Sequence, residues 1–127
     1  YNSMPKKILI VEDDIILQMA IVKAIEDEGF DVLEAVDGEE ALYNIETEKP
    51  DLVLLDLLLP KKTGWRVLKE IREHKSEPIR DIPVIVLTAI GEDKSLKECS
   101  KYGIDDYLIK SEYSLDTVIE KIKNSLI

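Results

Sequence analysis

Short apolar runs that recur along the chain restrict its possible folds more than any other feature of the sequence. Four of them are continuous rather than alternating: Ile8–Val11, Leu52–Leu55, Val84–Leu87 and Tyr107–Ile109. Continuous apolar runs are typical of strands that are buried on both faces of a parallel sheet. A fifth and more polar candidate, Asp31–Ala35, suits the outer position in such a sheet. We therefore predict five parallel strands.

The segments between these runs have the spacing of amphipathic helices, with apolar residues three and four positions apart. The apolar faces are Leu17, Ile21, Ala24 and Ile25; Ala41, Leu42 and Ile45; Val67, Leu68 and Ile71; Leu96 and Cys99; and Leu115, Val118, Ile119, Ile122 and Leu126. Gly29 and Gly103 stand where two of these helices are expected to end. Thr63 and Ser114 stand where two others are expected to begin. The alternation predicts an α/β fold, a (βα)5 doubly wound parallel sheet with helices on both faces.

The charge balance restricts the partners of the protein. The 127 residues include 27 acidic and 17 basic side chains, a formal net charge of -10. Such a surface repels phosphate backbones and anionic lipids, so we expect no direct binding to nucleic acid or membranes. The single cysteine, Cys99, favours a cytoplasmic location. Residues 1–3 resemble the remnant of an expression tag, which leaves 4–127 as one predicted domain.

Chemically active side chains follow four of the predicted strands at their carboxyl ends, where sheets of this kind bind their ligands. They are Glu12, Asp13 and Asp14 after the first strand along the chain, Asp56 after the third, Thr88 after the fourth and Lys110 after the fifth. Each has an ordinary structural interpretation when taken alone. Asp14 fits a helix N-cap, and a single aspartate after a strand is usually a turn residue. Their common position is what indicates a site.

The combination of these residue types indicates phosphoryl chemistry. Carboxylates crowded at one place repel one another and call for a hard cation, for which Mg²⁺ is suited. A carboxylate can also act as a nucleophile and carry an acyl phosphate. The Lys110 ammonium and the metal would neutralise the phosphoryl oxygens, and the Thr88 hydroxyl would donate a hydrogen bond. The pattern predicts that Asp56 accepts a phosphoryl group.

The sequence resembles the receiver domain of two-component response regulators, the CheY-like family, from about Lys6 to Leu126. The matching segments are Ile8–Asp14, Asp51–Pro60, Gly64, Val84–Ala89 and Gly103–Lys110. Their spacing extends over the whole domain, which makes the combination specific. The resemblance implies the flavodoxin-like strand order 2-1-3-4-5 and a role in phosphorelay signal transduction. It also implies a regulatory domain that assists only its own phosphorylation and dephosphorylation, not an enzyme.

Specific roles follow from the resemblance. It implies that Asp56 receives its phosphoryl group from a phosphohistidine on a sensor histidine kinase or a histidine phosphotransfer protein. Asp13, Asp56 and the backbone carbonyl of Leu58 would hold Mg²⁺, with Glu12 acting directly or through a water molecule. The downstream partner would be a separate protein target or a covalently linked effector domain, and we expect no effector domain within this chain.

The resemblance also implies how the phosphorylated state is detected. Thr88 and Lys110 would contact the phosphoryl oxygens, and Tyr107 matches the family's switch aromatic, whose ring turns inward when Thr88 moves toward the phosphate. A half-buried aromatic that never switches is the alternative interpretation of Tyr107. The fourth predicted helix, the fifth strand and the fifth helix would form the readout face. The same face is a candidate homodimer surface through Lys97, Glu98, Asp105, Glu120 and Lys123.

Two positions depart from the family pattern. Ser111 follows Lys110 where the family usually has a proline after a cis peptide. Because a cis bond before a non-proline residue costs about 3 kcal/mol, both isomers stay open. Glu12 replaces an aspartate, and its longer side chain favours a water-mediated contact to the metal. Away from the site, the pattern suggests no acid–base partner for His74, which we expect to be a surface residue, and we expect Cys99 to pack in the core.

Three other functions fit the sequence less well. An aspartate-based phosphatase of the haloacid dehalogenase type needs a second aspartate two residues after its nucleophile, where this chain has Leu58. A scaffold that is never phosphorylated typically lacks the acceptor, an acidic partner or the lysine, all of which are present. A nucleotide- or flavin-binding domain would offer glycine amides in its first turn, where this chain has Glu12, Asp13 and Asp14.

Overall fold

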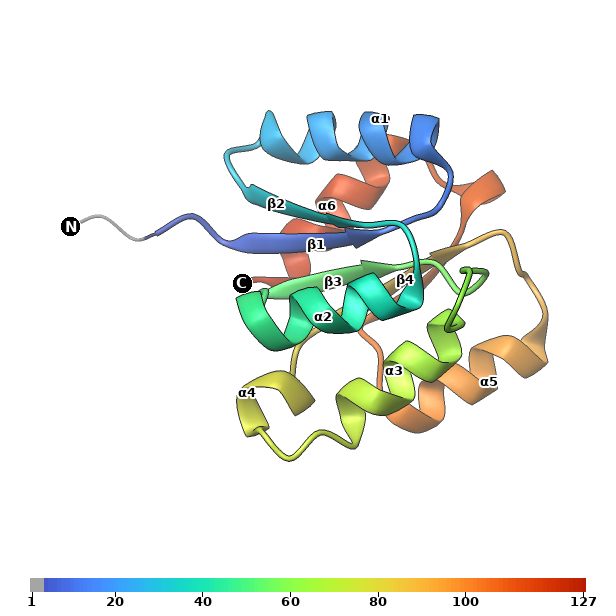
Figure 1. The fold of residues 1–127 in the computed structure, drawn as a ribbon. Helices are drawn as coiled ribbons and strands as arrows, with labels where there is room; N and C mark the ends of the chain where they lie inside the picture. Colours follow the sequence, from blue (N-terminus) through green and yellow to red (C-terminus); the bar gives the residue numbers. More distant parts are fainter. Residues whose placement is uncertain (1–3) are drawn as a thin grey trace.

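The structure is a computed structural model that describes residues 4–127, so the tag remnant predicted at residues 1–3 lies outside the described residues. One parallel sheet with the order β2-β1-β3-β4-β5 forms its central layer (Figure 1). The strands are β1 Lys7–Val11, β2 Asp31–Ala35, β3 Leu52–Leu55, β4 Val84–Thr88 and β5 Asp106–Ile109. The helices are α1 Ile15–Glu26, α2 Gly38–Glu48, α3 Gly64–Arg72, α4 Glu77–Arg80, α5 Asp93–Tyr102, the 3-10 turn η1 Lys110–Glu112 and α6 Leu115–Ser125. The predicted doubly wound sheet and its strand order are confirmed.

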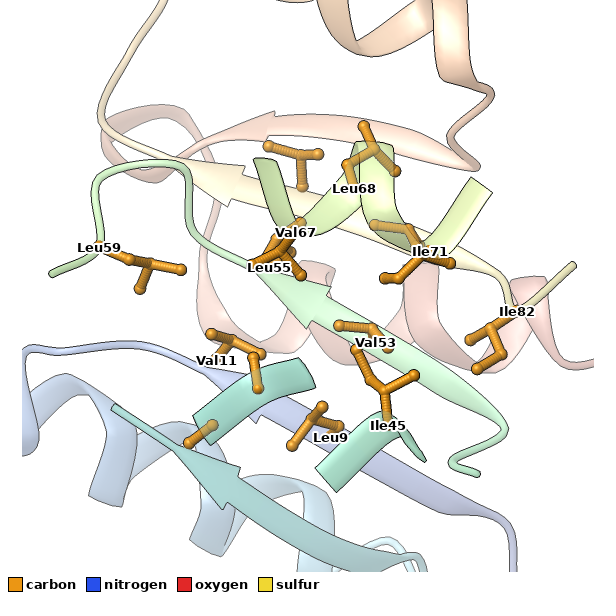
Figure 2. Packing of buried hydrophobic residues seen from close by; sticks show 14 of the residues in the cluster. Leu9, Val11, Ile45, Val53, Leu55, Leu59, Val67, Leu68, Ile71 and Ile82 are labelled. Atoms are coloured by element: carbon orange, nitrogen blue, oxygen red, sulfur yellow. The ribbon is translucent and has the colours of Figure 1, made fainter. Parts of the chain in front are cut away.

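Helices cover both faces of the sheet because alternate residues of each strand point to opposite sides. In β1, Leu9 and Val11 belong to the core beneath α2, α3 and α5, whereas Ile8 and Ile10 belong to the core beneath α1 and α6. Figure 2 shows the first of these layers. Every residue of β3 and β4 is buried, which explains why both strands are continuous apolar runs in the sequence.

Side-chain caps define where the helices begin and end. Asp14, Thr63 and Ser114 each accept a hydrogen bond from backbone N–H groups in the first turn of α1, α3 and α6. These bonds satisfy donors that have no partner within the helix. Gly103 ends α5 with a φ of 86°, a conformation that favours glycine. The caps predicted at Thr63, Ser114 and Gly103 are therefore confirmed.

Two local features differ from the sequence prediction. The one-turn helix α4 was not among the predicted helices, and Pro78 lies in its first turn, where its missing N–H costs no helical hydrogen bond. The apolar face predicted for α5 also differs, because Leu96 is 41% exposed. Ser95 is buried in its place together with Cys99. A polar side chain thus occupies part of the face by which α5 packs on the sheet.

Candidate functional site

The sheet register brings the carboxyl ends of the strands together. Val11 of β1 pairs with Leu55 of β3, so Glu12 and Asp56 follow neighbouring strands at the same level. Backbone hydrogen bonds continue past the strands: Asp56 N–H donates to the Val11 carbonyl at 3.1 Å, and Glu12 N–H donates to the Ala35 carbonyl at 3.0 Å. The backbones of both acidic residues are therefore held by the sheet itself.

Three carboxylates gather at this end of the sheet. Oxygen atoms of Glu12, Asp13 and Asp56 all lie within 4.8 Å of one another. Glu12 is 2% exposed and Asp56 is 4% exposed, whereas Asp13 is open to solvent. Like charges this close destabilise one another unless a cation lies among them. A set of carboxylate oxygens fits a hard divalent ion. We call these three residues, together with Lys110, the acidic rim.

Lys110 is the cation of the acidic rim. Its Nζ lies 2.8 Å from Glu12 Oε1 and 2.9 Å from Asp56 Oδ2. Burial disfavours the charged ammonium, but its hydrogen bonds to the two carboxylates outweigh that effect and raise the pKa of Lys110. The Lys110–Ser111 peptide, whose isomer the sequence left open, is trans, as are the other peptide bonds of the described residues. The lysine predicted to serve this site therefore reaches it.

Hydrogen bonds hold both the side chain and the backbone carbonyl of Glu12. The Asp14 N–H donates to Glu12 Oε2 at 3.1 Å, and Gln18 Nε2 donates to the Glu12 carbonyl at 3.1 Å and to the Ala35 carbonyl at 2.9 Å. Burial, together with the negative charge of Asp56, raises the pKa of Glu12 more than Lys110 and the hydrogen bond from Asp14 lower it. Gln18 was not identified from the sequence as a residue that supports the site. Its position among the apolar residues of one face of α1 was the signal that could have found it.

The loop after β3 folds tightly around Asp56. A Cβ atom on Gly64 would lie 2.2 Å from the Asp56 carbonyl oxygen and 2.6 Å from Leu57 Cα, so only glycine fits there. The Gly64 N–H donates to the Leu57 carbonyl at 2.8 Å, and the Leu58 N–H donates to Asp56 Oδ1 at 3.3 Å. This loop fixes the direction of the Asp56 carboxylate. The metal contact predicted for the Leu58 carbonyl stays a prediction.

The other two predicted residues connect this end of the sheet with α5. Thr88 is fully buried at the end of β4, and its hydroxyl accepts a hydrogen bond from the Ile90 N–H at 3.5 Å. The Tyr107 hydroxyl lies 2.7 Å from the Ile90 carbonyl oxygen and 2.8 Å from Ser95 Oγ. The half-buried ring of Tyr107 is thus turned toward α5. Ser95 was missed in the sequence, although its position four residues before Cys99 places it on the buried face.

Two residues lie outside the acidic rim, His74 and Cys99. The sequence pattern suggested no acid–base partner for His74, but its Nε2 lies 2.5 Å from Glu46 Oε1 and its Nδ1 accepts from the Ser76 N–H at 2.9 Å. Glu46 is 28 residues away, so no local pattern reveals the pair. Cys99 is fully buried, as predicted, and burial raises the pKa of its thiol to about 11.

The strand order and the acidic rim together have the form of a receiver domain. The family model described as "Response regulator receiver domain" matches residues 8–123. The chain is 42% identical over 107 residues to the alkaline phosphatase synthesis transcriptional regulatory protein PhoP of Bacillus subtilis, a match of 84% of this chain and 43% of PhoP. The chain belongs to the response regulator receiver domain family, which acts in two-component signalling. It spans less than half the length of PhoP.

Solved structures agree with this assignment. The CheY-like response regulator receiver domain protein from Methanospirillum hungatei superimposes with a TM-score of 0.88 at 28% identity, over 97% of this chain and 94% of that one. The BeF3-activated N-terminal receiver domain of RstA from Klebsiella pneumoniae gives a TM-score of 0.84 at 29% identity, over 95% of this chain and 98% of that one. Within residues 4–127, no helix has the length and apolar character that crossing a membrane requires.

Proposed function

We propose that this domain is a phosphorylation-controlled switch in a phosphorelay and that Asp56 is its phosphoacceptor. The donor is a phosphohistidine on a sensor histidine kinase or a histidine phosphotransfer protein. The observation that carries the proposal is the buried Asp56 carboxylate, which is fixed by the backbone and lies 2.9 Å from the Lys110 ammonium. A nucleophilic oxygen held in place beside a cation supplies the positioning and charge neutralisation that phosphoryl transfer needs.

The proposed reaction transfers the phosphoryl group without net redox change. An Asp56 carboxylate oxygen forms a bond to phosphorus while the phosphorus–nitrogen bond of the donor breaks. The electron pair of that bond stays on the donor imidazole, which takes up a proton. Lys110 contacts the charged oxygens of the transferred group, and Thr88 donates its hydroxyl hydrogen to one of them.

The metal in this proposal is Mg²⁺, held by Glu12, Asp13, Asp56 and the backbone carbonyl of Leu58. The acidic rim supports it, since three carboxylates lie within 4.8 Å of one another and Lys110 offsets only one of their charges. A small hard cation prefers oxygen ligands, and the negative charge that Lys110 leaves unbalanced favours its binding. When bound, the ion neutralises charge on the phosphoryl oxygens.

We also propose that the domain is a regulatory acceptor and not a phosphatase for other substrates. Leu58 lies two residues after Asp56, where an aspartate-based phosphatase requires an acid–base carboxyl group, and its side chain is apolar and 53% exposed. Residues 4–127 act as a single receiver domain in this proposal. A cytoplasmic location belongs to it as well and is compatible with the single reduced thiol of Cys99.

The start of α1 is the proposed contact surface for the donor protein. Ile15, Ile16 and Met19 are 53%, 81% and 64% exposed, and Ile15 follows the acidic segment after β1 almost directly. Exposed apolar side chains grouped in this way mark interaction sites. A donor has to reach Asp56 from this side of the sheet. The Ile16→Ser variant is expected to slow transfer from a phosphohistidine protein and to leave labelling by acetyl phosphate unchanged.

The proposed readout face consists of α5, β5 and α6, and it is also the proposed dimer surface. Lys97, Asp105 and Glu120 are exposed on it, whereas Glu98 and Lys123 already form ion pairs within the chain. The output partner is a separate protein or a linked effector domain. The greater length of PhoP supports the second of these. Sedimentation with and without beryllofluoride tests the dimer. A monomer in both states contradicts it.

Intact-mass measurement after incubation with acetyl phosphate and Mg²⁺ tests the proposed function. We expect a gain of one phosphoryl group by the wild type, and none for Asp56→Asn or after chelation of the metal. Asp51→Asn is the matched control, because Asp51 lies at the opposite end of β3 and binds the Lys7 N–H. Labelling of Asp56→Asn would contradict the proposal. So would a wild type that neither gains mass nor is stabilised by beryllofluoride.

A further inference from the structure

The hydrogen bonds around Tyr107 have a defined direction. A hydroxyl group has one hydrogen to donate, and the Tyr107 hydroxyl has two partners, the Ile90 carbonyl at 2.7 Å and Ser95 Oγ at 2.8 Å. The carbonyl oxygen can only accept, so Tyr107 donates to Ile90. The short contact with Ser95 is then a hydrogen bond in which the Ser95 hydroxyl donates to the Tyr107 oxygen.

The same direction continues through the Ile90 peptide to Thr88. The Ile90 N–H donates to Thr88 Oγ1 at 3.5 Å, at the long end of hydrogen-bond distances. Thr88 then keeps its own hydroxyl hydrogen to donate. The donors therefore run in one sense from α5 toward the phosphoryl site: Ser95 to Tyr107, Tyr107 to the Ile90 carbonyl, and the Ile90 amide to Thr88. Ser95 is 6% exposed, so the hydrogen bond at the α5 end of this series is shielded from water.

We propose that Ser95 is a positioning residue that couples α5 to the state of Asp56 through this directed chain of hydrogen bonds. This inference rests on the proposed function, because the last donor of the chain, Thr88, is the group that meets the phosphoryl oxygen.

The direction of these hydrogen bonds determines whether phosphorylation of Asp56 strengthens or weakens the contact between α5 and β5. When Thr88 donates to a phosphoryl oxygen, its own oxygen becomes a better acceptor for the Ile90 N–H. That bond polarises the Ile90 peptide, whose carbonyl then accepts more strongly from Tyr107, and the Tyr107 oxygen accepts more strongly from Ser95. Phosphorylation thus tightens the attachment of α5 to β5. Linkage is reciprocal: if phosphorylation strengthens the hydrogen bond from Ser95 by a given factor, loss of the Ser95 hydroxyl must weaken the binding of a phosphoryl group by that factor.

The affinity of the protein for beryllofluoride in the presence of Mg²⁺ measures this coupling. It is determined from the rise in the unfolding temperature as the ligand concentration increases. We expect Ser95→Ala to weaken the affinity about two- to fivefold, which is less than the full free energy of one neutral hydrogen bond. Ser95→Thr keeps the hydroxyl and is expected to restore it. Ser100→Ala, at an exposed position of the same helix, is the matched control and should have no effect. In a Tyr107→Phe background, Ser95→Ala should have no further effect, since the acceptor of its hydrogen bond is gone.

Spectrophotometric titration of Tyr107, identified by difference from Tyr107→Phe, separates positioning from general loosening. Burial raises the pKa of Tyr107, and the hydrogen bond from Ser95 partly lowers it again, while Cys99 and Glu92 add smaller increases. Ser95→Ala leaves those two groups in place, so we expect the pKa of Tyr107 to rise further. A fall toward the ordinary value would show that the ring had merely loosened, and that result overturns the proposal.

The two proposals fail in distinguishable ways. If the wild type neither binds beryllofluoride nor accepts a phosphoryl group, the proposed function fails and this inference fails with it. If the wild type binds and Ser95→Ala binds equally well with an unchanged Tyr107 titration, only the role of Ser95 is overturned. Urea unfolding of each variant shows that it is folded under the conditions of the binding measurement.

Discussion

The two ends of the sheet accommodate buried charge in opposite ways. At the amino end, the Arg72 guanidinium donates four hydrogen bonds to neutral backbone carbonyls: Nε to Tyr102 and Gly103 at 2.9 and 3.0 Å, and Nη1 to Arg80 and Ile82 at 2.8 Å each. At the carboxyl end, the three carboxylates of the acidic rim lie close together, and one ammonium group contacts two of them, Glu12 and Asp56.

The difference separates a structural site from a functional one. Arg72 binds the end of α3 to the ends of α4 and α5 and to the segment before β4, and it needs no further partner. The acidic rim retains mutual repulsion among its carboxylates that a divalent cation would relieve. Sites that bind charged ligands commonly lower the stability of the empty protein. Removing the Arg72 charge and removing one carboxylate of the acidic rim should therefore change stability in opposite directions.

The largest effect is expected at the amino end. Arg72→Met removes the donor from four carbonyl groups, and we expect the free energy of unfolding to fall by about 3 kcal/mol. Labelling of Asp56 by acetyl phosphate should persist in the folded fraction. Urea unfolding measures the change, with Arg66→Met as the control, since Arg66 forms an exposed pair with Glu70. A loss as small as that of the control would contradict the structural role.

Gly64→Ala should produce the next largest loss. The added Cβ would lie 2.2 Å from the Asp56 carbonyl oxygen, so the loop after β3 must shift, at a cost of about 2 kcal/mol. The shift also moves Asp56, the proposed acceptor, and labelling by acetyl phosphate should slow. Gly91→Ala is the matched control, because its Cβ would meet only the flexible end of Ile109 at 3.1 Å. Equal stability of the two variants would show that the loop is not tightly fitted.

Asp13→Asn is expected to stabilise the metal-free protein by about 1 kcal/mol, because it removes one of three neighbouring negative charges. The same variant should lose the stabilisation that we expect Mg²⁺ to give the wild type. Thermal unfolding with and without Mg²⁺ measures both effects. The adjacent Asp14→Ala should instead destabilise the protein by about 1 kcal/mol, because it removes the N-cap of α1. Destabilisation by Asp13→Asn without metal would contradict the proposed repulsion.

The smallest effect is expected at Cys99, a nucleophile that the fold makes inert. Its thiol has a pKa of about 11, so only about one molecule in a thousand carries the thiolate at pH 8. The fold favours the neutral thiol, and the resulting stabilisation is present below the ordinary pKa of 9 and lost between about pH 9 and 11. Ellman's reagent should react with Cys99 only after unfolding in urea. Rapid reaction of the folded protein would contradict this.

The sequence predicted the parts of the protein that depend on local patterns. Continuous apolar runs predicted the buried strands, and the residues after them predicted which side chains meet, because parallel strands share one carboxyl end. The pairs His74–Glu46 and Ser95–Tyr107 could not be predicted, since they depend on how helices are placed on the sheet. The exposure of Leu96 was missed for a related reason, because the contacts of α5 with the rest of the fold set its rotation and bury the polar Ser95 in place of Leu96.

Identification of the phosphorylated residue tests the central claim most directly. Borohydride reduces an aspartyl phosphate to homoserine, so peptide mass spectrometry after acetyl phosphate treatment can locate the modified position. We predict conversion at Asp56 alone, dependent on Mg²⁺ and retained in Ser95→Ala. Conversion at Glu12, Asp13 or another carboxylate, or no conversion in a protein that Mg²⁺ and beryllofluoride fail to stabilise, would contradict the account.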